Sequence, residues 1–88
     1  MQRDTAAAIR AIAQQEPQVQ KAGLPVTMYV RAEDVLLALD VVFADGVAAD
    51  DAAASVERIE HAILKRFPKI TRIYIESRNR IDVSAAAG

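Results

Sequence analysis

One aspartate in this sequence stands where a metal ligand could lie on a β-sheet. Asp40 is the single ionisable residue in the run 35–43, and the other eight residues of that run are apolar. A carboxylate at this position could bind a cation, or it could pair with Arg31 or Arg72 on neighbouring strands. The ordinary alternative is that Asp40 is paired or solvated near the exposed end of its strand, because buried carboxylates are usually paired.

The lone histidine is the second candidate metal ligand. His61 follows Glu57 by four residues, so the two side chains could share a divalent cation on one side of a helix. Any solvated helix surface gives the same spacing. We therefore take Asp40 and His61 as weak candidate metal sites, with zinc as the example of a cation they could bind.

Basic side chains gather in the last third of the chain. They are Lys65, Arg66, Lys69, Arg72, Arg78 and Arg80. Such a series could contact a lipid head group or an acidic partner, and a helix C-terminus followed by a solvated strand end also explains it. Over the whole chain, 11 basic residues nearly balance 12 acidic ones, which argues against a nucleic-acid partner.

No arrangement of residues typical of catalysis is present, and we predict that the protein is not an enzyme. The chain has no cysteine, and its glycines are isolated at positions 23, 46 and 88, so thiolate chemistry and a glycine-rich phosphate loop are both excluded. With 88 residues the chain predicts one domain with a small core, for which association with a second copy would add stability. No apolar run reaches the length of a membrane span, so we expect a cytoplasmic protein.

The elements that position these residues follow from hydrophobic spacing. A helix is predicted from Asp4, as N-cap, to about Gln15, where Pro17 forces its end, followed by a polar connector over 18–23. Residues 26–31 alternate as a half-buried strand, and a turn at 32–34 leads into the central strand 35–43.

The second half of the chain predicts a helix, a strand and a tail. Ala52, Val56, Ile59, Ile63 and Phe67 recur at helical spacing, which predicts an amphipathic helix from about 50 to 67 that Pro68 ends. Residues 70–76 form an Ile-rich strand, which should pair with the central strand in parallel because a helix connects the two. We expect a single domain over 1–77 and a flexible tail over 78–88.

The predicted fold is α+β with the order αββαβ, a two-layer sandwich in which two helices cover one face of a three-stranded mixed sheet. The odd-numbered residues of 35–43 are predicted to face the helices. The even-numbered set, Asp40 included, should then share the open face with Tyr29, Arg31, Arg72 and Tyr74. An apolar centre with tyrosine and arginine around it is typical of an interface.

Four segments of the sequence resemble a known family. These are EDVLLALDVVF at 33–43, VERIE at 56–60, AILKRFP at 62–68 and TRIYIE at 71–76. They are similar to the C-terminal cytoplasmic domain of cation diffusion facilitator transporters. The resemblance spans about 6–77 and implies a metallochaperone-like, or ferredoxin-like, αββαβ fold, a homodimer and attachment to a membrane transporter domain.

The resemblance also implies where metal ligands would lie. They fall near Asp40, Ala53, Ile75 and Ser77, and of these only Asp40 can bind a cation strongly. We therefore expect the dimerisation and regulatory domain of a divalent cation efflux transporter, the cytoplasmic part of an inner-membrane protein, with most metal-sensing ligands missing. The alternative is a separate metal sensor or carrier with a carboxylate and histidine site where two copies meet.

Overall fold

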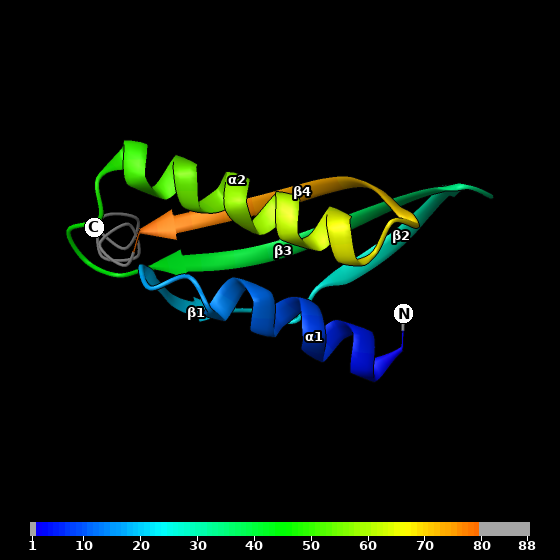
Figure 1. Cartoon of the computed structure of the whole chain (residues 1–88), viewed down its shortest axis with the longest axis horizontal. Helices are drawn as coiled ribbons and strands as arrows, with labels where there is room; N and C mark the ends of the chain where they lie inside the picture. The colour runs from blue at the N-terminus through cyan, green and yellow to red at the C-terminus, as the bar shows by residue number, and fades with distance from the viewer. Residues whose placement is uncertain (1, 80–88) are drawn as a thin grey trace, which may run out of the picture.

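Two helices and four strands make up the computed structural model, which describes residues 2–79 (Figure 1). The elements are α1 (Arg3–Gln14), β1 (Val19–Ala22), β2 (Val26–Arg31), β3 (Asp34–Phe43), α2 (Ala49–Arg66) and β4 (Ile70–Asn79). Both helices lie on one face of the sheet and contact each other there. The predicted α+β, two-layer sandwich is confirmed.

The central position of the apolar strand is also confirmed. β3 pairs with β2 in an antiparallel hairpin and with β4 in parallel, so the sheet is mixed as expected. Having neighbours along both edges and helices above one face, β3 supplies more of the buried core than any other strand. Its odd-numbered residues Leu37, Leu39, Val41 and Phe43 are buried against the helices, as predicted.

The number of strands differs from the prediction. The segment 18–23, expected to be a polar connector, contains the short strand β1, which pairs with the last residues of β3. β1 and β2 both pair with β3, at opposite ends of it, and are separated by Gly23, Leu24 and Pro25. Proline has no N–H to donate to the ladder, which breaks this edge in two. The order αββαβ holds when β1 and β2 are counted as one interrupted strand.

The boundaries of the helices agree with the hydrophobic pattern, but one predicted cap is wrong. α1 begins at Arg3 after Gln2, with no side-chain cap, and Asp4 lies in the first turn, where the helix dipole favours a carboxylate. Ile9 and Ala13 are buried on its inner side. In α2 the predicted apolar residues face the core, with Ile59 and Ile63 fully enclosed.

The last strand is longer than predicted. β4 runs to Asn79, past Glu76 and into the expected tail, because its parallel pairing continues along β3 to Phe43. Backbone pairing thus extends the strand over Ser77 to Asn79, where the side chains have no apolar pattern. The rest of the predicted tail, 80–88, lies outside the described residues.

Candidate functional site: the open face of the sheet

The face of the sheet opposite the helices carries the candidate residues. We define this open face by residues that share one side according to the strand register: Lys21, Val26, Met28, Leu36, Ala38, Asp40, Val42, Arg72, Tyr74, Glu76 and Arg78. Residues directly opposite each other on paired strands point to the same side. Val26 is opposite Ala38, and Met28 is opposite Leu36.

Large apolar side chains on this face are not covered by the domain itself. Val26 is 60% exposed, Met28 58% and Tyr74 60%. The strand 26–31, predicted to be half-buried, therefore turns its valine and methionine side chains away from the core. A contiguous apolar surface of this kind on a small domain usually marks an interaction site.

The prediction for Tyr29 is wrong. It lies opposite Val35, on the same side of the sheet as the helices, and lines a hollow with Phe67 at the end of α2. The reason is the register of the hairpin, which places Met28 and not Tyr29 across from Leu36. Arg31 lies opposite Asp34 next to the turn, after an irregularity in the pairing.

Asp40 lies on the open face, as predicted, and its side chain is exposed. Its neighbour on β4 is Glu76, whose Oε1 accepts a hydrogen bond from Arg78 at 3.2 Å. Arg72, one of the expected partners of Asp40, instead forms an ion pair with Asp34 at 3.3 Å. Two carboxylates thus stand side by side on the open face, with one arginine beside them.

His61 is placed far from Asp40. It is exposed on α2 beside Glu57, on the side of the helix that faces away from the sheet. A full sandwich layer therefore separates the two candidate ligands. Within residues 2–79 no group of three metal-binding side chains comes together.

Two of the other positions implied by the resemblance do meet. Ala53 on α2 and Ser77 on β4 line one hollow of about 430 Å³, next to Phe43. Asp40 does not belong to it, because its side chain is on the opposite face of the sheet. An alanine and a serine offer no strong metal ligand there.

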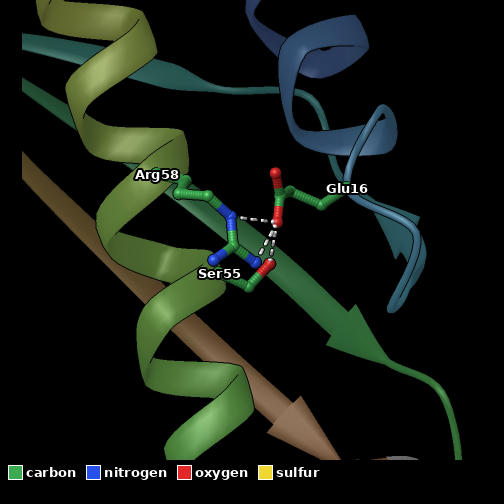
Figure 2. Close-up of polar contacts among 3 residues, drawn as sticks. All are labelled: Glu16, Ser55 and Arg58. Atoms are coloured by element: carbon green, nitrogen blue, oxygen red, sulfur yellow. Dashed lines mark hydrogen bonds and ion pairs between the residues drawn. The ribbon is translucent and has the colours of Figure 1, made fainter.

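A partly buried polar cluster that was not predicted from the sequence links the end of α1 to α2. Figure 2 shows Ser55 and Arg58 of α2 converging on Glu16, which follows α1. Glu16 Oε1 accepts hydrogen bonds from Ser55 Oγ at 2.7 Å, from Arg58 Nε at 3.0 Å and from Arg58 Nη2 at 2.8 Å. The signal was present in the spacing, since Ser55 precedes the core residues Ile59 and Ile63 by one and two turns.

The charge of Glu16 is stabilised by this arrangement. Hydrogen bonding from Arg58 lowers the pKa of the Glu16 carboxyl below its ordinary value of 4.5, against the opposing effect of its burial, and Ser55 adds to the lowering. The same contact raises the pKa of Arg58. Glu16 therefore stays ionised at neutral pH. We call the contacts of Glu16 with Ser55 and Arg58 the ionised clamp, because they connect the segment between α1 and β1 to α2.

Comparison with solved structures identifies proteins that share this fold. A histidine-to-alanine variant of the MamM C-terminal domain superposes with a TM-score of 0.76 and 16% identity, over 91% of this chain and 99% of that domain. The fold is that of the MamM C-terminal domain. The αββαβ fold that the resemblance in the sequence implied is therefore confirmed.

Other forms of the same MamM domain match equally well. A nickel form of a glutamate-to-histidine variant has a TM-score of 0.75 at 15% identity, covering 90% of this chain and 99% of that one. A cadmium form of an aspartate-to-glutamate variant gives 0.75 at 15% identity, covering 89% and 96%. No family model and no curated protein matches the sequence. Within residues 2–79, neither α1 nor α2 combines the length and the hydrophobicity of a membrane span.

Proposed function

We propose that this chain is the dimerisation and regulatory domain of a divalent cation efflux transporter, acting at the cytoplasmic side of an inner membrane and not as an enzyme. The observation that carries the proposal is the uncovered apolar open face on a MamM-type fold. Val26, Met28 and Tyr74 are each more than half exposed in a domain whose two helices cover only the other face.

A second copy of the chain fits this face best. The open face carries Lys21, Arg72 and Arg78 together with Asp40 and Glu76, so positive and negative groups are both present around the apolar centre. In a two-fold dimer the same surface contributes both sides, and such a mixed surface can be its own complement. Pairing would also bury apolar area that so small a core needs for stability.

The test is the oligomeric state in solution. Analytical ultracentrifugation should give the mass of a dimer at micromolar concentration. Met28→Lys should weaken association at least about tenfold, because it places an unpaired charge in the apolar part of the open face, opposite Leu36. Leu64→Lys is the matched control, since Leu64 is a 40% exposed apolar residue on α2, away from the open face, and this variant should still dimerise. A monomeric wild type, or equal effects of both substitutions, would contradict the proposal.

A second candidate function is divalent-metal binding where two open faces meet. The adjacency of Asp40 and Glu76 favours it, because each copy would bring a carboxylate pair to the contact, and the MamM relatives include nickel and cadmium forms. Within residues 2–79 no complete set of ligands exists in one copy, so binding would require the dimer.

Calorimetric titration with zinc tests this candidate. We expect weak binding that Asp40→Asn removes and that His61→Ala leaves unchanged, because His61 lies on the outer side of α2. Loss of binding on His61→Ala alone would show that the site lies elsewhere. Absence of heat and of any thermal shift in the wild type would end the candidate.

A further inference from the structure

The charged side chains of residues 2–79 are distributed unevenly along the long axis, which measures 42 Å. At one end lie the β2–β3 turn, the start of α1 and the connection from α2 to β4 (Figure 1, right side). We call this the hairpin end. The opposite end carries Asp45, Asp50 and Asp51 around the start of α2, with Arg78 beside them at the end of β4. This asymmetry is not visible in the net charge of −1.

Basic side chains outnumber acidic ones at the hairpin end. They are Arg3, Arg31, Lys65, Arg66, Lys69 and Arg72, against Asp4, Glu33 and Asp34. Asp34 is already paired with Arg72. Arg66 and Lys69 are both exposed, and within residues 2–79 no ion pair is formed by either.

The same end is hollowed between these cations. One hollow of about 720 Å³ lies between α1, β2 and the end of α2, and another of about 510 Å³ adjoins it beside the turn. They share Tyr29, Val35, Pro68 and Lys69. Arg66 stands at 5.5 Å from the centre of the Phe67 ring, which holds its guanidinium at the rim of the larger hollow.

We propose that the hairpin end docks on the anionic phospholipid head groups of a membrane surface. Arg66 and Lys69 would contact the phosphates, and Tyr29, 74% exposed, would lie at the level of the head groups, where tyrosine is favoured. An approach with the acidic end toward the same surface would be repelled, so the field favours the orientation with the hairpin end toward the lipid.

This inference rests on the proposed function in one respect. The choice of lipid over an acidic protein follows from the proposed attachment to a membrane transporter, since the start of α1 lies at the hairpin end and a domain tethered there has that end nearest to the bilayer. The chemistry of cations around an apolar and aromatic hollow is itself independent of that attachment.

Vesicle co-sedimentation of the chain tests the inference. We expect binding to vesicles of phosphatidylglycerol mixed with phosphatidylcholine, little binding to phosphatidylcholine alone, and weakening as salt is raised. The double variant Arg66→Ala with Lys69→Ala should bind roughly thirtyfold more weakly, at about 1 kcal/mol for each basic residue. The charge-matched control, Gln14→Glu with Ala53→Glu, lowers the net charge by the same two units at exposed helix positions outside both the hairpin end and the open face, and it should lose less than about threefold.

The inference would be overturned by no binding to anionic vesicles at low salt, by equal binding to phosphatidylcholine, or by equal losses in both double variants. Competition by millimolar inorganic phosphate would also overturn it, because it would show a site for the free anion. Sedimentation of the Arg66→Ala and Lys69→Ala variant separates a further case. Loss of the dimer in this variant would show that the hairpin end meets a second copy and would overturn the inference. A wild type that dimerises but does not bind anionic vesicles would refute the docking and leave the proposed function standing.

Discussion

Glu16 accepts three side-chain hydrogen bonds, and its environment has a consequence for the dependence of stability on pH. Its side chain is 18% exposed and accepts from a serine that is fully buried. Since folding lowers its pKa below 4.5, the carboxylate contributes stability at pH values above 4.5 and loses that contribution as the pH falls through the lower, folded value.

We predict that Glu16→Ala lowers the free energy of unfolding by about 1 kcal/mol at pH 7, mainly because the buried Ser55 hydroxyl loses its acceptor. The difference from the wild type should shrink as the pH is lowered below 4.5. Urea denaturation at several pH values measures this. Glu57→Ala, which removes an exposed glutamate from the outer side of α2, should change stability by less than about 0.5 kcal/mol. A constant difference between Glu16→Ala and wild type at all pH values would contradict the ionised clamp.

At the scale of the element, the two faces of β3 have different environments. Leu39 is 2% exposed and packs under the helices, whereas Leu36 is only partly buried on the open face. Leu36 and Leu39 therefore have different roles although both are leucines, because successive side chains of a strand point to opposite sides of the sheet.

We predict that Leu39→Ala lowers the free energy of unfolding by about 2–5 kcal/mol, since it leaves a cavity in a closed core. In a domain of this size that is a large part of a total of roughly 4–13 kcal/mol. Leu36→Ala should affect folding much less and dimerisation more. Chemical denaturation combined with sedimentation distinguishes the two variants, and equal losses of folding stability would refute the assignment of the faces.

At the scale of the whole molecule, the proposed activities use two surfaces that have only Arg72 in common. The open face would meet a second copy, the hairpin end would meet lipid, and the outer side of α2 with His61 takes part in neither. Met28→Lys should therefore weaken the dimer and leave the contacts of Arg66 and Lys69 with lipid in place. Lipid affinity should fall only by the part that comes from two linked copies binding one membrane. The two surfaces differ because two helices can cover only one face of a sheet, which leaves the open face uncovered. The hairpin end is a second surface because the β2–β3 turn and the C-terminus of α2 lie together at one end of the sheet.

Much of this architecture is encoded in local spacing. The apolar run 35–43 predicted the central strand, the recurrence of Val56, Ile59 and Ile63 predicted α2, and the even and odd residues of β3 were assigned to the correct faces. These features depend on the periods of a helix and a strand, which are properties of neighbouring residues. β1 was missed because a segment of four residues with Gln20 and Lys21 has no such period.

By itself, the sequence determined the α+β class, the order of the main elements and the candidacy of Asp40 and His61. Only the tertiary structure decided that these two residues lie on opposite sides of the sandwich, that Glu76 stands beside Asp40, and that Tyr29 faces the hairpin end. It also joined Glu16 to Ser55 and Arg58, about forty residues further on. The physical reason is that strand register and the packing of distant helices set these neighbours, and neither is written in the spacing of residues along one element.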